Sequence, residues 1–353
     1  MHGRDRRSRI ERRRPRNQLP AKAAVGLALL FSGRAGLPLH SRQHDFPLCI
    51  RPTAARPPPQ GHSLLRWTQS SPLTALHPNA LALGAIALWA SLATLGVRLS
   101  HLPPFWLTGV ALLVGSVIAL PLSRWDVRQW RVPMRTLLLG IYGLFGYHFL
   151  LFMALRHAPP VQANLVNYLW PLGMVVMSPL FLPGPRLGAR QVLAALLGFA
   201  GAALAITGGQ GLDGTLAWGY LPALAAALVW SSYSLLTQRV AAFPTSAIGL
   251  FAFVSGLLSL LCHALLEPAV TLTADDGLWL LVMGLGPLGA AFFLWDAALK
   301  RGDARQIGLL SFLTPLLSTW LLLWSRGETP QASMALATAL IVGAAWLGRN
   351  RPA

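Results

Sequence analysis

Within residues 79–348, the second half of the sequence repeats the first half at an offset of about 144 residues. The run Ala-Leu-Arg at 154–156 returns as Ala-Leu-Lys at 298–300, and several of the residues that follow match in the same register. An earlier segment repeats at nearly the same spacing, because Trp89 recurs as Trp230. Internal repeats in apolar chains are typical of membrane transporters, so this feature restricts the fold more than any other.

Ten apolar segments follow one another in the same region, separated by short loops rich in Pro, Gly and Arg. Each is close to the ~20 residues that a helix needs to cross a bilayer. Only 11% of the chain is charged, against about 25% in a soluble domain. Backbone polar groups must be bonded within lipid, so we expect helices. The segments span approximately 79–98, 104–122, 135–155, 160–182, 188–207, 215–236, 245–266, 277–298, 305–324 and 330–348.

The basic residues of the loops predict the orientation of these helices. With the N-terminus in the cytoplasm, twelve Lys and Arg residues fall on the cytoplasmic side and three on the opposite side, which is a positive-inside bias. Each repeat holds five helices, and an odd number inverts the second copy. The expected fold is therefore an all-α membrane protein with ten transmembrane helices in two inverted five-helix repeats, 79–208 and 215–348, with both termini cytoplasmic.

Residues 1–78 have a different composition, with 14 of the 29 Lys and Arg residues and several Pro-rich stretches. We expect a disordered extension or sequence upstream of the true start; a signal peptide around the apolar run 23–31 is the alternative. A pI near 11.6 is typical of nucleic-acid-binding proteins. The basic residues of the main body, however, lie in separate short loops and form no stripe, so no nucleic-acid partner is expected.

Several kinds of active site are excluded by the absence of their motifs. The chain has no Walker P-loop, no H-E-x-x-H run and no G-x-S-x-G run, which argues against direct ATP drive and common hydrolases. The two cysteines, Cys49 and Cys262, form neither a metal-binding spacing nor a disulfide framework. We therefore expect no catalytic residue, no cofactor and no metal site.

Polar and aromatic residues inside apolar helices are the candidates for a binding site, since burying them in lipid is costly. The fourth segment carries Asn164, Asn167, Tyr168 and Trp170 directly before Pro171. A mid-helix proline removes one backbone donor and frees a carbonyl one turn earlier. The sequence therefore predicts a loosened turn at mid-membrane, which is where transporters place substrate contacts.

The ninth segment repeats this arrangement with Ser311, Thr314 and Pro315. One such proline alone would be read as a kink that serves packing. Two prolines at equivalent positions of a repeat, each beside polar side chains, favour a binding site instead. The packing explanation stays open for either proline.

The third and eighth segments add further candidates. Tyr147 and His148 lie near the middle of a span, where a neutral imidazole could bind a carboxylate or carry a proton. The alternative is a histidine held by a backbone carbonyl. Trp295 and Asp296 lie in the eighth segment, and Asp296 is a candidate for a substrate ammonium or a proton. The alternative there is an i,i+4 ion pair with Lys300.

Trp89 and Trp230 lie at mid-helix rather than at the membrane interface. Tryptophan in the wall of a cavity stacks on planar ligands and attracts cations, so both are candidate substrate contacts. Packing is the alternative for each of them. The fifth and tenth segments are rich in glycine and alanine, which allows close helix approach, and we expect them to be a packing pair and a candidate homodimer interface.

The repeat with its tryptophans, together with the runs at 298–302 and 311–315, resembles the EamA branch of the drug/metabolite transporter superfamily. Within it, Val-Asn-Tyr-Leu-Trp-Pro at 166–171 is similar to the fourth-helix motif of the YddG-type aromatic amino acid exporters. This resemblance covers 79–348 and implies a central cavity. Asp296 departs from the asparagine expected there. The residues that the resemblance places in the cavity are Tyr147, His148, Tyr168, Trp170, Pro171 and Trp230.

Repeat, site and resemblance together predict an inner-membrane secondary transporter that exports amino acids, aromatic or bulky and hydrophobic ones, by alternating access. Its partners are then a small-molecule substrate and the lipid bilayer. Export of another small metabolite, such as a purine or a drug-like amphiphile, is the first alternative. A membrane-embedded enzyme or scaffold that binds lipid is the second, and inverted halves offer such a protein no evident advantage.

Overall fold

The computed structural model describes residues 76–183, 187–211 and 216–348, and nearly all of the expected N-terminal extension lies outside this part. Every regular element within it is a helix. The first half contains α2 (Pro78–Ala90), α3 (Leu92–Arg98), α4 (Pro104–Ser116), α5 (Ala119–Leu122), η2 (Val127–Trp130), α6 (Met134–Ile141), η3 (Tyr142–Gly146), α7 (Tyr147–His157), α8 (Pro160–Asn167), α9 (Trp170–Phe181) and α10 (Ala189–Thr207). The second half contains α11 (Tyr220–Leu236), η4 (Thr245–Ala247), α12 (Ile248–Leu266), α13 (Asp276–Leu285), η5 (Gly286–Ala290), α14 (Ala291–Leu299), α15 (Ala304–Leu310), α16 (Leu313–Arg326) and α17 (Ala332–Leu347).

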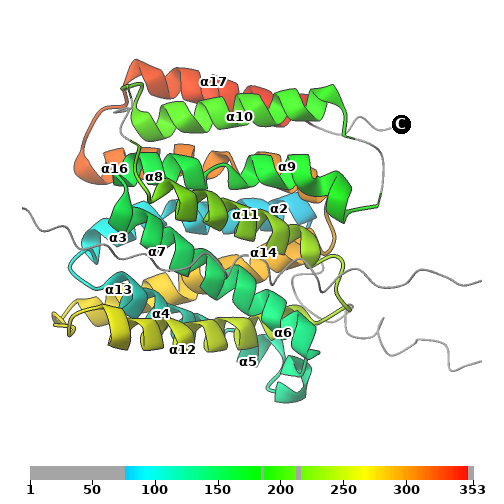
Figure 1. Cartoon of the computed structure of the whole chain (residues 1–353), viewed down its shortest axis with the longest axis vertical. Helices are drawn as coiled ribbons and strands as arrows, with labels where there is room; N and C mark the ends of the chain where they lie inside the picture. Colours follow the sequence, from blue (N-terminus) through cyan, green and yellow to red (C-terminus); the bar gives the residue numbers. More distant parts are fainter. Residues whose placement is uncertain (1–75, 184–186, 212–215, 349–353) are drawn as a thin grey trace, which may run out of the picture. The chain divides into compact units, whose positions relative to one another are not determined.

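Seven helical spans in the described part are long and apolar enough to cross a membrane (Figure 1). α11 and α17 are apolar but shorter, and the fourth expected segment is divided into α8 and α9. The all-helical expectation is therefore confirmed for the described residues, and the number of ten stays a prediction. The seven spans are Pro78–Arg98, Pro104–Leu122, Met134–His157, Ala189–Thr207, Thr245–Leu266, Asp276–Leu299 and Ala304–Arg326.

The sixth expected segment starts later than the sequence suggests, because α11 begins at Tyr220 and not near residue 215. Gly219 lies directly against the end of α7, where its amide donates to the His157 carbonyl at 3.2 Å. A Cβ at this glycine would meet the Ala154 carbonyl oxygen at 2.5 Å. The chain thus first contacts α7 with its bare backbone and only then enters the helix.

Two backbone features recur at the spacing of the repeat. The π-helical turns η3 and η5 begin at Tyr142 and Gly286, 144 residues apart, and each lies within a membrane-length span. The helix is broken at 168–169, between α8 and α9, and again at 311–312, between α15 and α16, 143 residues later. A proline stands among the first three residues of the helix after each break. The loosened turns that the sequence predicts beside these prolines are therefore present.

α10 and α17 lie side by side at one edge of the helical bundle (Figure 1) and pack against each other. Gly201 permits the close approach, because a Cβ there would meet the Ile341 side chain at 2.7 Å. Together with part of α16 they form an apolar cluster separate from the main core, which α2, α4, α9, α11, α12 and α14 share. The expected packing of the fifth and tenth segments is confirmed, and the homodimer stays a prediction.

Candidate functional site

Four tryptophans from four different helices meet in the main core. Trp89 comes from α2, Trp170 from α9, Trp230 from α11 and Trp295 from α14, and none of them is more than 9% exposed. The ring centroids of Trp89 lie 5.1 Å from Trp295 and 5.7 Å from Trp230, and Trp170 lies 5.7 Å from Trp295. The structure thus joins four candidates from separate segments into one group, here called the tryptophan cluster.

Hydrogen bonds hold two of these indoles in place. Trp89 Nε1 donates to the Pro287 carbonyl of η5 at 3.1 Å, and Trp295 Nε1 donates to Ser234 Oγ of α11 at 3.2 Å. A buried indole N–H requires a partner, so each bond decides which edge of the ring faces the cluster. The remaining edges and faces are apolar surfaces suited to a planar group.

The two π-helical turns each supply a carbonyl to a site residue. Leu144 of η3 accepts a hydrogen bond from His148 Nδ1 at 2.6 Å, and Pro287 of η5 accepts the bond from Trp89. Such turns shift carbonyls out of the regular helical ladder and are frequent at functional sites. A carbonyl can only accept, so Nδ1 carries hydrogen and Nε2 of the neutral ring is left as an acceptor. A histidine held by a backbone carbonyl, the simpler of the two alternatives, is what the structure contains.

A free polar acceptor lies beside the cluster. The Tyr147 ring is 5.3 Å from Trp230, and the Tyr147 hydroxyl accepts a hydrogen bond from Asn167 Nδ2 at 3.1 Å. Asn167 is 3% exposed, and its Oδ1 has no hydrogen-bond partner among the described residues. A buried oxygen without a donor is costly to the fold, and it can accept a hydrogen bond from a ligand. This side of the cluster therefore combines aromatic rings with an unused acceptor.

Two aromatic neighbours of the cluster were missed among the predicted site residues. Phe292 lies 5.8 Å and Tyr233 lies 5.3 Å from Trp230, measured between ring centroids. Phe292 precedes Trp295 by three positions and Tyr233 follows Trp230 by three, so the i,i+3 spacing of a helix face could have found both. Gly143 of η3 makes room for Tyr233, because a Cβ there would overlap the tyrosine ring.

The predicted residues at the first helix break lie next to Trp170 in the sequence. Asn164 and Tyr168 are half-buried, and Pro171 is buried in the first turn of α9. The Asn164 carbonyl accepts from the Tyr168 amide at 2.9 Å and so closes α8 just before Trp170. The break thereby sets the direction in which α9 presents Trp170.

The predicted residues at the second break lie in a different environment. Ser311 is fully buried, and its hydroxyl donates to the Ile307 carbonyl of its own helix at 2.9 Å. Thr314 and Pro315 are buried too, and Thr314 Oγ1 lacks a partner within the described ranges. No hydrogen bond or ring contact of the described chain joins these three residues to the tryptophan cluster. The two breaks therefore match in backbone and differ in their surroundings.

Asp296 directly follows Trp295 in α14 and forms the i,i+4 ion pair that the sequence offered as its simpler interpretation. Lys300 Nζ donates to Asp296 Oδ2 at 2.6 Å. The same ammonium donates to Thr245 Oγ1 at 3.3 Å and lies 3.9 Å from the centroid of the Phe243 ring. Asp296 is 3% exposed, and its Oδ1 has no partner in the described part of the chain.

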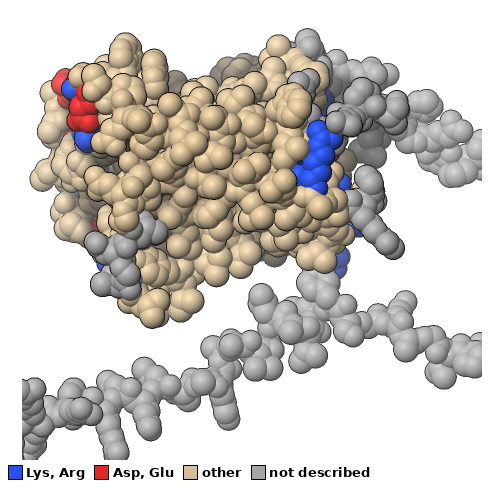
Figure 2. All heavy atoms as spheres, turned by 90° about the horizontal axis from the view of Figure 1, so that it is seen from above, with Lys and Arg blue, Asp and Glu red and all other residues tan. Residues whose placement is uncertain are grey.

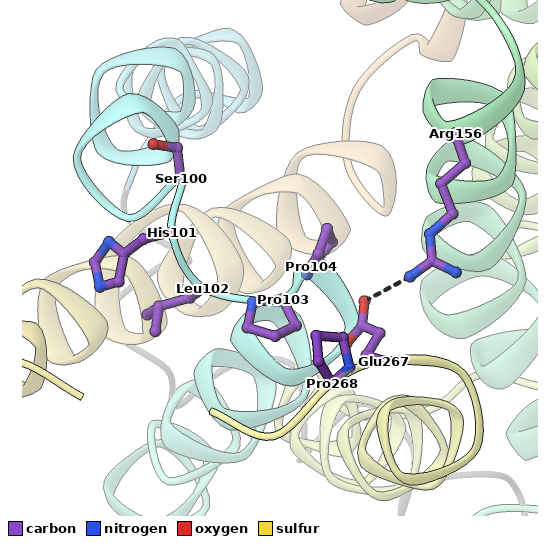
Figure 3. Close-up of a pocket in the computed structure, with 8 residues that line it drawn as sticks. All are labelled: Ser100, His101, Leu102, Pro103, Pro104, Arg156, Glu267 and Pro268. Carbon is purple, nitrogen blue, oxygen red and sulfur yellow. Dashed lines mark hydrogen bonds and ion pairs between the residues drawn. The ribbon is translucent and has the colours of Figure 1, made fainter. Parts of the chain in front are cut away.

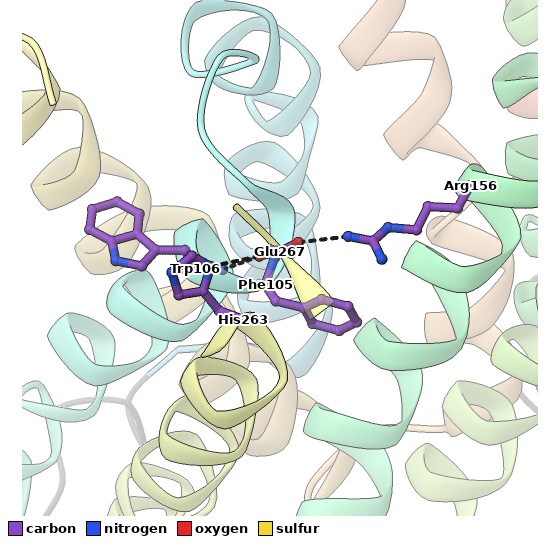
Figure 4. Close-up of polar contacts among 5 residues, drawn as sticks. All are labelled: Phe105, Trp106, Arg156, His263 and Glu267. Atoms are coloured by element: carbon purple, nitrogen blue, oxygen red, sulfur yellow. Dashed lines mark hydrogen bonds and ion pairs between the residues drawn. The ribbon is translucent and has the colours of Figure 1, made fainter. Parts of the chain in front are cut away.

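A second buried carboxylate, which sequence reasoning did not single out as a site residue, lies at the far end of α12. Glu267 is 0% exposed at its side chain and accepts hydrogen bonds from three helices (Figure 4). Two come from the backbone amides of Phe105 and Trp106 at the start of α4, at 3.0 and 3.1 Å. The others come from Arg156 Nη2 at 3.2 Å and His263 Nδ1 at 3.1 Å. Both carboxylate oxygens are thus fully satisfied.

A pocket of about 250 Å³ lies next to this carboxylate, as Figure 3 shows. Its walls come from the loop between α3 and α4 and from the ends of α7 and α12. Within the described ranges, no group of three or more His, Cys, Asp or Glu side chains lies close enough to hold a metal ion. The pocket is lined by Ser100, His101, Leu102, Pro103, Pro104, Arg156, Glu267 and Pro268.

Comparison with known proteins adds independent information. The model of the EamA-like transporter family matches the chain twice, at residues 78–207 and 217–348. The aromatic amino acid exporter YddG of Ancylobacter novellus is 42% identical over 267 residues, 74% of this chain and 93% of that protein. A probable terminal-alkyne amino-acid exporter of Streptantibioticus cattleyicolor is 27% identical and covers 69% of this chain and 84% of its own length. A solved crystal structure with 40% identity superimposes with a TM-score of 0.72, over 77% of this chain and 96% of that one.

Proposed function

The chain belongs to the EamA-like transporter family, and we propose that it exports amino acids with aromatic or bulky hydrophobic side chains across the inner membrane by alternating access. It is a multi-pass membrane transporter and not an enzyme. The observation that carries the choice of substrate is the tryptophan cluster with the free Asn167 Oδ1 beside it. The 42% identical relative named as an aromatic amino acid exporter supports the same choice.

The aromatic side chain and the ammonium of an aromatic amino acid each have a matching group in this site. Indole and phenol rings pack edge-to-face or offset against a planar side chain, with about 0.5–1.5 kcal/mol per ring pair beyond burial of area. Asn167 Oδ1 is suited to the substrate ammonium, and the aromatic faces add cation–π attraction. Ring contacts now link all four indoles of the cluster, so the substrate enters only when at least one of them moves.

We further propose that the two family matches are five-helix repeats of inverted topology, with α8 and α9 together as one broken span and α11 and α17 as spans. The π-helical turns 144 residues apart and the helix breaks 143 residues apart support this. On the face drawn in Figure 2, one end carries Lys and Arg alone, and the opposite end carries acidic side chains as well. This distribution supports a cytoplasmic location for the basic end and for both termini.

Ser311, Thr314 and Pro315 remain part of the proposal as residues that loosen the second repeat, because the break beside them matches the one beside Pro171. A homodimer through α10 and α17 is also proposed. Their small residues are used within the chain, so the dimer would use the exposed apolar side chains of these helices. These are Leu193, Leu196, Leu336, Val342 and Trp346.

Export of a non-aromatic amino acid is the second candidate. It is favoured by the relative named as a probable terminal-alkyne amino-acid exporter, which matches over most of its length. A terminal alkyne is apolar but neither planar nor aromatic, so such a substrate would use the apolar faces of the indoles without stacking on them.

The test is transport of labelled tryptophan, phenylalanine and threonine by the purified protein in liposomes. We expect saturable tryptophan and phenylalanine flux that is at least about tenfold faster than threonine flux, since a difference of about 1.4 kcal/mol gives that factor. Trp230→Ala should remove most of the aromatic preference. Trp324→Ala is the matched control, because that tryptophan is 70% exposed on α16 and should leave the preference unchanged.

Two results would contradict the aromatic substrate. One is equal saturable flux of all three amino acids, which would favour the second candidate. The other is an unchanged aromatic preference in Trp230→Ala. Transport by Trp230→Phe and thermal unfolding of both variants separate a loss of substrate binding from a loss of folding.

A further inference from the structure

Asp296 is the buried acidic residue next to the tryptophan cluster, and only half of its carboxylate is used. Oδ2 accepts the hydrogen bond from Lys300, whereas Oδ1 has no partner among the described residues. An ionised carboxylate offers about four acceptor positions. Burying one of its oxygens without any donor is costly, and a proton on that oxygen lowers the cost by removing the charge.

Glu267 shows what a structural carboxylate looks like in the same protein. It accepts from two backbone amides, a guanidinium and an imidazole (Figure 4), so no position is left for a proton. Arg156, its partner, and Lys300, the partner of Asp296, occupy equivalent places in the sequence repeat. Both carboxylates form an ion pair, so Glu267 and Asp296 differ in the number of hydrogen-bond donors that each one has.

The groups that face Asp296 from neighbouring elements are few. α2, η4 and η5, which pack against α14, contain no titratable residue. α15 brings Arg305, which donates to Ser178 Oγ at 2.7 Å. α12 brings Cys262 and His263 only at its far end, near Glu267. Directly after α14, Lys300 pairs with Asp296, and Arg301 donates to the Ala297 carbonyl at 3.3 Å. Asp303 accepts from the Arg305 amide, and Tyr233 lies on α11. Lys300 is 26% exposed at its side chain, against 3% for Asp296.

We propose that Asp296 is the proton-binding site of the exporter, with the proton carried on Oδ1. The inference rests on the proposed export function. A proton from solution adds to the carboxylate and gives the neutral acid, and the ammonium of Lys300 loses its charged partner. Because Trp295 and Phe292 lie on the same short helix as Asp296, a shift of α14 after this neutralisation moves two rings of the substrate site. Inward proton movement can thereby drive outward substrate movement.

The test uses the full chain in liposomes and separates two readouts. Counterflow, the exchange of labelled for unlabelled tryptophan without a gradient, reports substrate binding and helix movement. Accumulation of tryptophan driven by an imposed pH gradient reports proton coupling. We expect the native protein to show both, and Asp296→Asn to keep counterflow within about twofold while losing at least tenfold of the gradient-driven accumulation.

Each other outcome has a definite meaning. Gradient-driven accumulation that survives Asp296→Asn overturns the proton site. Loss of counterflow in a folded Asp296→Asn protein also overturns it, because the carboxylate then binds the substrate ammonium. Counterflow without any response to the gradient in the native protein overturns the coupling but leaves the export function standing. Absence of counterflow in the native protein contradicts the export function itself.

A second measurement does not depend on transport. Infrared difference spectra of the purified protein across the pH range detect the carbonyl band of a protonated carboxyl group. The band assigned to Asp296 should disappear in Asp296→Asn, shift in Asp296→Glu and persist in Glu267→Gln. Spectra of native protein and Asp296→Asn that are identical at every pH overturn the proposal.

Discussion

The sequence repeat contains two equivalent cations, Arg156 and Lys300, and the fold uses them in opposite ways. Arg156 reaches from α7 to Glu267 at the end of α12, 111 residues away, in a network that also includes the start of α4. Lys300 pairs with Asp296 within one helical turn of its own chain segment. The Glu267 network holds three helices together, whereas the Asp296 pair leaves one carboxylate oxygen without a hydrogen bond. The two equivalent cations thus pair with different kinds of carboxylate. Arg156 pairs with one that links helices, and Lys300 pairs with one that keeps an unused oxygen.

The helix dipole strengthens the difference between the two. Glu267 lies at the N-terminus of α4, where backbone N–H groups without helical partners carry partial positive charge and favour an anion. Asp296 lies near the C-terminal end of α14, where the partial charge is negative. The α4 dipole therefore stabilises a negative charge at Glu267, and the α14 dipole gives Asp296 no such stabilisation.

The largest effect is expected from Glu267→Ala. This change removes the acceptor of two α4 backbone amides and the partner of Arg156, so buried donors are left without bonds. Each buried donor left without a partner costs about 1–3 kcal/mol. Thermal unfolding of the purified protein in detergent should show a stronger destabilisation for this variant than for Lys300→Met or Arg156→Lys. A midpoint equal to that of the native protein would show that the network is not a structural tie.

A smaller loss is expected from Lys300→Met. Asp296 is left without its donor, and a buried acceptor that loses its partner costs about 1–3 kcal/mol. The double variant Lys300→Met with Asp296→Asn should recover most of this loss, because no charge remains buried. Equal thermal stability of the double and single variants would mean that charge burial is not what Lys300 relieves.

The smallest effect is expected from Arg156→Lys. The Arg156 side chain is 36% exposed, and Glu267 keeps three other donors, so solvent screening limits the change to under about 1 kcal/mol. The same thermal measurement applies, with Arg156→Met to separate charge from packing on Phe105. A loss as large as that of Glu267→Ala would make Arg156, and not the α4 amides, the main partner of the carboxylate.

Local chemistry explains which parts of the site could be predicted. The broken helix beside Pro171 and the ion pair of Asp296 with Lys300 depend on residues within about one turn of each other, so spacing alone reveals them. The tryptophans could be chosen as candidates because aromatic residues at mid-helix are unusual in a membrane span. That Trp89 touches Trp295 could not be predicted, since these rings come from opposite halves of the chain.

Glu267 marks the limit of the same reasoning. In the sequence it is one acidic residue in a loop, with nothing to distinguish it from its neighbours. Its donors lie 161, 162 and 111 residues away, apart from His263. The backbone contact of Gly219 with α7 could not be predicted for the same reason, because it depends on a close approach of two distant segments that no sequence pattern indicates.

Hydrophobic length, loop charge and the repeat were enough to predict an all-helical membrane transporter, because the first two follow from the cost of placing charge and unbonded backbone in lipid. The family came from the resemblance of particular residues and was shown by the comparison with known proteins. Packing of distant helices decided the rest. It gathered four tryptophans into one cluster, gave Glu267 four donors and left Asp296 Oδ1 with none. Most of those outcomes depend on contacts between segments 60 or more residues apart, whose energies no local pattern contains.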